Sequence, residues 1–137
     1  MAYDEDKIPE ILHNSKNIAV VGISEKTDRD SYGVAEYLKK QGYTIIPINP
    51  GLKEWNGIKA YPDLLSVPGS MKIDVVDIFR KPDAVVPIVR DALKRKPSAI
   101  WMQEGVINND AAEIARNAGV LVVMDRCMMK EHHKIKK

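Results

Sequence analysis

The residues best suited to chemistry lie in a loop directly after the first apolar run of the chain. This loop, residues 22–33, contains two glycines together with hydroxyl and cationic side chains: Ser24, Lys26, Arg29 and Ser31. Gly22 allows a tight turn, and the backbone N–H groups of the helix start that follows favour an anion. The loop therefore predicts a cradle for phosphate or pyrophosphate. A plain turn between a strand and a helix is the alternative, because the spacing is not GxGxxG.

Two later apolar runs, at 73–79 and 98–102, also lead into residues that could contact a ligand. The first ends in an aromatic ring and two cations that suit a purine and phosphates, Phe79, Arg80 and Lys81. A core position for Phe79, with both cations solvated, is equally compatible with composition. The second run leads into polar groups and a glycine that permits close approach: Gln103, Glu104 and Gly105. In a parallel sheet such loops share one edge, which predicts an extended groove.

The run at 43–49 bears on which nucleotide would bind. NAD-binding folds usually place an acidic residue at the end of the second strand to hold the ribose hydroxyls. Here Asn49 and Pro50 occupy that position. Asn49 could bond a ribose, but the missing acid counts against NAD, whereas Lys53 could meet the extra phosphate of NADP. If the loops do bind a dinucleotide, the protein would be an NAD(P)-dependent oxidoreductase or a nucleotide-binding redox sensor, and this is kept as the alternative to the function expected below.

The elements that would position these residues follow from alternation along the chain. Five β-branched apolar runs, at 17–22, 43–49, 73–79, 98–102 and 119–125, are separated by helical patterns at about 30–42, 61–66, 83–96 and 108–119. This alternation predicts an α/β fold, a Rossmann-like, three-layer, doubly wound parallel sheet of five strands in the order 3-2-1-4-5. We expect a single domain over residues 1–137. Residues 4–14 are predicted to form an N-terminal helix, and 126–137 a polar, basic tail that frays.

Composition restricts the class of protein. The 137 residues carry a net charge of only +2, so nucleic-acid binding through overall charge is not expected. No run approaches the roughly 20 apolar residues that span a bilayer, and the acidic N-terminus does not resemble a signal peptide. A single cysteine, Cys127, excludes an internal disulfide. These features predict a cytoplasmic protein that interacts with neither a membrane nor nucleic acid.

Catalytic machinery is not evident in the sequence. The three histidines, His13, His132 and His133, lie outside the ligand-bearing loops, and no spacing of zinc ligands is present. Cys127 follows the last apolar run, at the same predicted edge as the groove, with Arg126 and Lys130 nearby to favour its thiolate. It could form a mixed disulfide with the thiol of a bound ligand. The simpler interpretation is that Cys127 serves as a small apolar residue that covers the edge of the sheet.

Several stretches together resemble the CoA-binding family of small Rossmann proteins, which is similar to the first domain of the succinyl-CoA synthetase alpha subunit. The matching stretches are VVGIS at 20–24, SYGVA at 31–35, GYTIIPINP at 42–50, DIFRKP at 77–82, WMQEGV at 101–106 and VVMDRCMMKEH at 122–132.

The resemblance implies that coenzyme A, free or acylated, is the ligand. It places Gly22, Ile23 and Ser24 at the nucleotide end. Phe79, Arg80 and Lys81 would border the adenine and phosphates, and Gln103, Glu104 and Gly105 would form the opposite lip. The chain lacks the synthetase's further domain with its phosphorylated histidine, so the expected function is CoA binding without catalysis, as a carrier, sensor or regulatory module.

Overall fold

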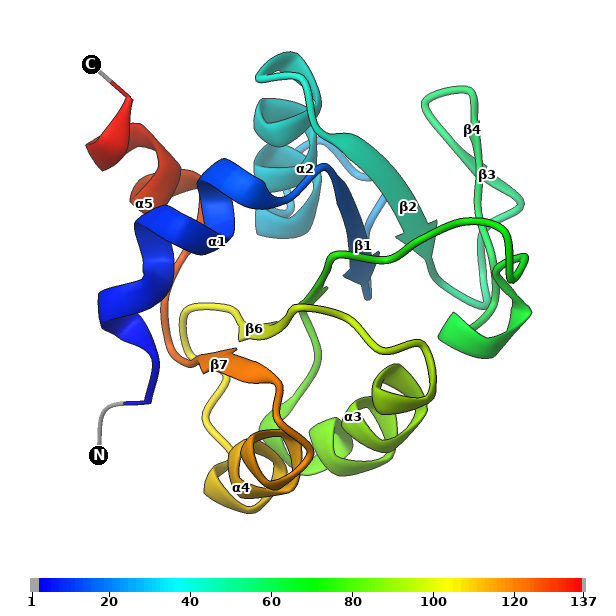
Figure 1. Ribbon diagram of the computed structural model, residues 1–137. Coiled ribbons are helices and arrows are strands. Elements are labelled where there is room, and N and C mark those ends of the chain that lie inside the picture. The colour runs from blue at the N-terminus through cyan, green and yellow to red at the C-terminus, as the bar shows by residue number, and fades with distance from the viewer. Residues whose placement is uncertain (1–2, 137) are drawn as a thin grey trace.

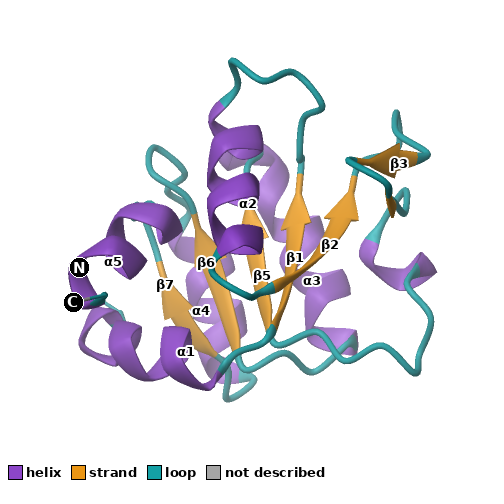
Figure 2. Ribbon diagram, turned by 90° about the horizontal axis from the view of Figure 1, so that it is seen from above, coloured by secondary structure: helices purple, strands orange, loops and turns teal. Residues whose placement is uncertain are grey.

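A computed structural model describes residues 3–136 and shows three layers, with a parallel sheet between two layers of helices (Figures 1 and 2). The five strands are β1 (Asn17–Val21), β2 (Thr44–Ile48), β5 (Val75–Ile78), β6 (Ala99–Met102) and β7 (Leu121–Val123). Their apolar side chains alternate between two buried clusters, one on each face of the sheet. The predicted α/β, doubly wound, three-layer fold is therefore confirmed.

The predicted strand order was wrong. The order is β2-β1-β5-β6-β7, so the third of the five strands lies beside the first, and β2 forms an edge. Pro47 provides the physical reason. Its carbonyl oxygen accepts a hydrogen bond from the Tyr61 N–H on the outer side of β2. Because proline has no N–H, it cannot donate a hydrogen bond to a further strand on that side. Proline in a sheet is confined to edge strands or bulges, so this residue argued against an internal position for β2.

Helices α1 (Ile8–Asn14), α2 (Asp30–Lys40) and α5 (Met128–Ile135) cover one face, and α3 (Val85–Lys94) and α4 (Asn109–Asn117) cover the other. A 3₁₀ turn, η1 (Glu5–Lys7), precedes α1, and two others, η2 (Leu64–Ser66) and η3 (Pro82–Ala84), lie before β5 and α3. Asn108 caps α4 by accepting a hydrogen bond from the Ala111 N–H at 2.9 Å. Helix α2 has Arg29 at its N-cap, and no side chain of the described chain caps it.

The C-terminal segment is not the fraying tail that its polarity suggested. Residues 128–135 form α5, whose Met128 is fully buried beside α1 and α2. His132, in the last turns, stacks edge-on against Tyr37 and Tyr43, and its Nδ1 lies 2.9 Å from the Tyr37 hydroxyl. Burial of one apolar face, rather than overall composition, decides the structure of this segment.

A small hairpin, β3 (Glu54–Trp55) and β4 (Ile58–Lys59), was not predicted. Its two-residue turn is Asn56-Gly57, and both residues have positive φ, as a type I′ turn requires. The hairpin buries Trp55, only 1% exposed, against the helices of the α2 face. It therefore extends the core beyond β2 and toward the loop that follows β1.

Candidate functional site

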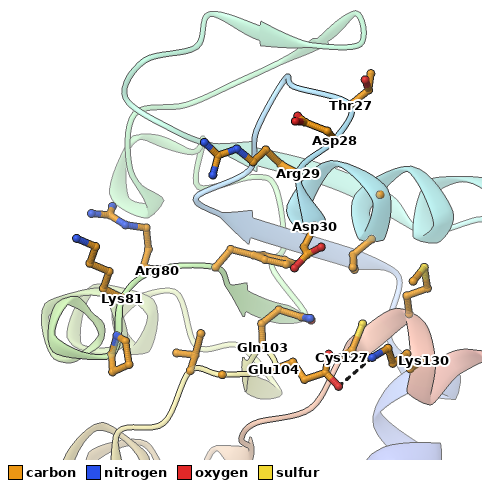
Figure 3. Close-up of a pocket in the computed structure, with 17 residues that line it drawn as sticks. Thr27, Asp28, Arg29, Asp30, Arg80, Lys81, Gln103, Glu104, Cys127 and Lys130 are labelled. Atoms are coloured by element: carbon orange, nitrogen blue, oxygen red, sulfur yellow. Dashed lines mark hydrogen bonds and ion pairs between the residues drawn. The ribbon is translucent and has the colours of Figure 1, made fainter.

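A cavity of about 850 Å³ lies at the carboxyl edge of the sheet, between the loops after β1, β5 and β6 and the start of α5 (Figure 3). Its size falls within the range typical of small-molecule sites. It is lined by residues 27–30, 33–34, 79–82, 103–106, 127 and 129–130. The site thus occupies the edge where ligands bind in open α/β sheets.

A second, more polar hollow of about 450 Å³ adjoins the cavity, and the two share Phe79 and residues 28–30. Its lining includes Gly22, Ser24, Lys26 and Ser31. It faces the uncapped first turn of α2, whose backbone N–H groups are oriented for an anion. The structure thus brings the predicted cradle residues together at one hollow, and phosphate binding there stays a prediction.

Hydrogen bonds from within the loop and from the segment after β2 determine the shape of the cradle. The Ser24 N–H donates to the Ser31 hydroxyl oxygen at 3.0 Å, and the Lys26 N–H donates to the Ser24 hydroxyl oxygen at 3.0 Å. From outside the loop, the Asn49 amide donates to the Ile23 carbonyl at 2.7 Å, and the Trp55 indole donates to the Ser24 carbonyl at 2.9 Å. The loop is consequently held on both sides by hydrogen bonds within the chain.

Gly22 brings the loop after β1 into contact with the loop after β5. Its φ is +85°, and a Cβ at this position would overlap the Phe79 carbonyl oxygen and crowd the Arg80 side chain. The switch point of the sheet lies here, between β1 and β5. Gln103–Gly105, which follow β6, are separated from Gly22 by β5, because β5 lies between β1 and β6.

Positive charge is in excess around the two hollows. Five cationic side chains line them, Lys26, Arg29, Arg80, Lys81 and Lys130, against three carboxylates, Asp28, Asp30 and Glu104. Lys130 is paired with Glu104 at 3.0 Å, whereas the other four cations form no ion pair within residues 3–136. An anionic ligand would therefore meet cations that are not already neutralised.

The wall opposite the β5 loop belongs to α5 and the end of β6. Gln103, only 4% exposed, accepts a hydrogen bond from the Met128 N–H at 3.0 Å and thereby fixes the start of α5. The hydrogen bond from Lys130 to Glu104, together with the negative charge of that carboxylate, raises the pKa of the lysine. Cys127 is 5% exposed and contributes to the same wall.

Most of the predicted site residues converge here, with three exceptions. The Ile23 side chain is fully buried and lines neither hollow. The Asn49 amide group is engaged internally, since its nitrogen donates to Ile23 and its oxygen accepts from the Gly51 N–H at 2.7 Å. Pro50 lies beside Arg80 at a separate small hollow of about 160 Å³.

Sequence reasoning missed several lining residues. Asp28 and Asp30 lie in the predicted loop but were passed over in favour of its cations. Met129 lies in the predicted tail, although Met128, His132 and Ile135 recur at helical spacing and are a signal for α5. Among residues 3–136, no cluster of three or more His, Cys, Asp and Glu side chains is placed to hold a metal ion.

Fold and site together define a doubly wound α/β domain with a cavity at its switch point whose lining carries more cationic than anionic side chains. The family described as "CoA binding domain" matches this sequence over residues 16–133. The chain belongs to this family. No helix in the described part of the chain has both the length and the apolar character needed to cross a membrane.

The chain is similar both to small proteins and to parts of larger enzymes. It is 36% identical to the uncharacterized protein YneT of Bacillus subtilis, with 92% of each chain covered. A solved structure of a hypothetical protein from Pyrococcus horikoshii is 40% identical, with a TM-score of 0.92 and coverage of 96% of this chain and 92% of that one. An ADP-forming acetate–CoA ligase of Methanocaldococcus jannaschii is 27% identical over 82% of this chain, which spans only 17% of the ligase.

Proposed function

We propose that this protein binds coenzyme A, free or acylated, in the cavity at the carboxyl edge of the sheet. The observation that carries the proposal is a cationic cradle that adjoins a cavity of about 850 Å³ whose lining includes apolar side chains. Coenzyme A has the matching chemistry, because it joins a nucleotide with three phosphate groups to an uncharged pantetheine chain. Membership of the CoA binding domain family supports the same ligand.

A dinucleotide fits the geometry less well. The position that would hold a ribose in an NAD-binding fold is occupied by Asn49, whose amide nitrogen and oxygen both bond the backbone of this chain. Binding a ribose there would cost these bonds, which also shape the cradle. We therefore favour coenzyme A over NAD(P).

We further propose that the chain binds this ligand without transforming it. His13 and His132 lie at a separate hollow lined by residues that precede β1 and β2, at the opposite edge of the sheet from the cavity. A carrier or sensor of acylated coenzyme A is the role that fits such a site. Mass spectrometry of the ligand that copurifies with the protein tests this role. An acyl-CoA supports a carrier or sensor, whereas a tightly copurifying protein indicates a regulatory module.

Calorimetric titration tests the ligand and the site. We expect one coenzyme A to bind per chain, and Arg80→Ala to weaken binding by about tenfold or more, since a charge-assisted bond to phosphate is lost. Arg90→Ala is the matched control, because Arg90 is also exposed but lies on α3, outside the cavity. Tight binding of NADH or NADPH with no heat from coenzyme A would overturn the proposal.

Thiol exchange at Cys127 is a separate proposal. The Cys127 thiolate would attack oxidised coenzyme A, form a mixed disulfide and release one molecule of coenzyme A as its thiol. The pairing of Lys130 with Glu104 leaves less free positive charge beside Cys127 than the sequence suggested. Intact-mass measurement after incubation with oxidised coenzyme A detects the adduct, and noncovalent binding with no adduct would refute the exchange.

A further inference from the structure

The two ends of the large cavity differ in chemistry. Arg80 and Lys81 lie at one end, with Arg29 above them on the α2 side, and Cys127 and Lys130 lie at the other (Figure 3). The unpaired cations therefore gather at the end formed by the β5 loop. The end against α5 is lined by Val34, Cys127 and Met129, which share one core cluster, and the exposed Glu104–Lys130 ion pair lies at its rim.

Coenzyme A has the same polarity, with all of its phosphate charge at the nucleotide end. We propose that the nucleotide lies toward Arg80 and Lys81 and that the thiol end reaches α5, where the cavity forms a subsite for a short, uncharged acyl group. This inference rests on the proposed function and adds to it the class of thioester.

The wall at α5 limits the length of the acyl group. Val34 is 3% exposed and Cys127 5%, so both are packed against the core and cannot move aside. Behind Cys127, Met128 is fully buried and its N–H is held by Gln103. A longer acyl chain would have to leave the cavity toward solvent, because it cannot extend further into the protein.

The rim excludes an acyl group that carries a charge. Lys130 donates to both carboxylate oxygens of Glu104, at 3.0 and 3.1 Å, so its charge is neutralised within the protein. An acyl carboxylate at this position would have to displace Glu104 and remain close to it. A neutral group meets no such repulsion.

Met129 is the wall residue that adjusts the size of the subsite. It is half-buried, it lines the cavity, and its unbranched thioether is the most adaptable side chain in this wall. Replacing it with alanine enlarges the space at the acyl end without touching the cationic end.

Titrations with a series of ligands test the inference: coenzyme A, acetyl-CoA, octanoyl-CoA, succinyl-CoA and adenosine 3′,5′-bisphosphate, which has the nucleotide end alone. We expect coenzyme A and acetyl-CoA to bind within a fewfold of each other and octanoyl-CoA and succinyl-CoA to bind at least about tenfold more weakly. Met129→Ala should restore octanoyl-CoA binding and leave adenosine bisphosphate binding unchanged. Ile135→Ala, at the far end of α5 and outside the cavity, is the matched control.

The outcomes separate this inference from the proposed function. If coenzyme A and adenosine bisphosphate both fail to bind, the proposed function is wrong. If coenzyme A binds but octanoyl-CoA binds more tightly than acetyl-CoA, the cavity is able to bury the additional methylene groups. In that case the proposal of a subsite for short acyl groups is wrong. If Met129→Ala weakens the binding of adenosine bisphosphate, the nucleotide end of the ligand lies against α5, opposite to the proposed direction.

Discussion

The buried carboxyl group of Asp77 should make the stability of this protein fall as pH rises. Asp77 lies in the middle of the sheet, paired in register with Val20 of β1 and Trp101 of β6. Its side chain is fully buried, and neither carboxyl oxygen has a hydrogen-bond partner. Burial therefore raises the pKa of Asp77 well above its usual value, so the folded protein holds this acid in its neutral form.

The sign and size of the effect follow from linkage. In the unfolded chain an aspartate ionises above about pH 3.9, whereas in the folded protein it keeps its proton to higher pH. Between the two pKa values the free energy of unfolding decreases by about 1.4 kcal/mol per pH unit. The contribution is fully present below the unfolded pKa and is lost as pH rises through the folded pKa.

Two substitutions isolate this contribution. Asp77→Asn keeps the shape but cannot ionise, so it should remove the decrease in stability above pH 4. Asp77→Leu also removes the unpaired polar group and should add about 1–3 kcal/mol even at pH 4. Asp6→Asn is the control, because Asp6 is exposed and lies far from the sheet interior, on η1.

Urea unfolding followed by circular dichroism at pH 4.5, 6 and 7.5 measures these differences. We expect the wild type and Asp6→Asn to lose stability with rising pH and Asp77→Asn to lose less. Equal pH slopes for the wild type and Asp77→Asn would show that the carboxyl group is ionised in the folded protein, and the reasoning from its burial would be refuted.

Three further predictions concern the loops and α5. Gly22→Ala should destabilise the protein by about 1–3 kcal/mol in urea unfolding, because of its positive φ and the overlap with a carbonyl oxygen, whereas Gly33→Ala, with open space around it in α2, should not destabilise it. A similar loss in both variants would contradict this. Asp28→Asn should tighten coenzyme A binding a fewfold at low salt, as about 1 kcal/mol of repulsion is removed, and calorimetry at high salt should show the gain shrink. Burial, then the charges of Lys136 and His133, lower the pKa of His132. Neutral His132 therefore contributes stability that is lost as pH drops below about 6.5, a contribution opposite in sign to that of Asp77 over this range. Unfolding curves of His132→Gln should lack this contribution, and a pH dependence equal to that of the wild type would rule it out.

The elements of the sheet were predictable because buried parallel strands leave a strong pattern. Runs such as IAVV at 18–21 are apolar on both faces, and glycine or asparagine marks the ends of α2 and α4. The order of the strands was harder, because hydrophobicity does not distinguish one strand of a parallel sheet from the next. Only Pro47, through the N–H it lacks, carried information about which strand lies at the edge.

The candidate site was predictable to the extent that it lies in loops after strands. Parallel strands bring those loops to one edge in any order, so Arg29, Arg80 and Gln103 converge although the predicted order was wrong. The wall from α5 was not predicted, because its polar composition hid an apolar face. The role of Asn49 could not be read from its type, since an amide can bond a ribose or its own backbone equally well.

The hydrogen bonds that Asn49 and Trp55 make to the loop after β1 affect how tightly the loop can bind a ligand. A loop that is already ordered loses little conformational entropy when the ligand arrives, so more of the contact energy is retained as affinity. The hairpin that carries Trp55 thereby acts on binding from outside the cavity. A change in its packing would loosen the cradle and lower affinity while leaving every residue that faces the ligand in place.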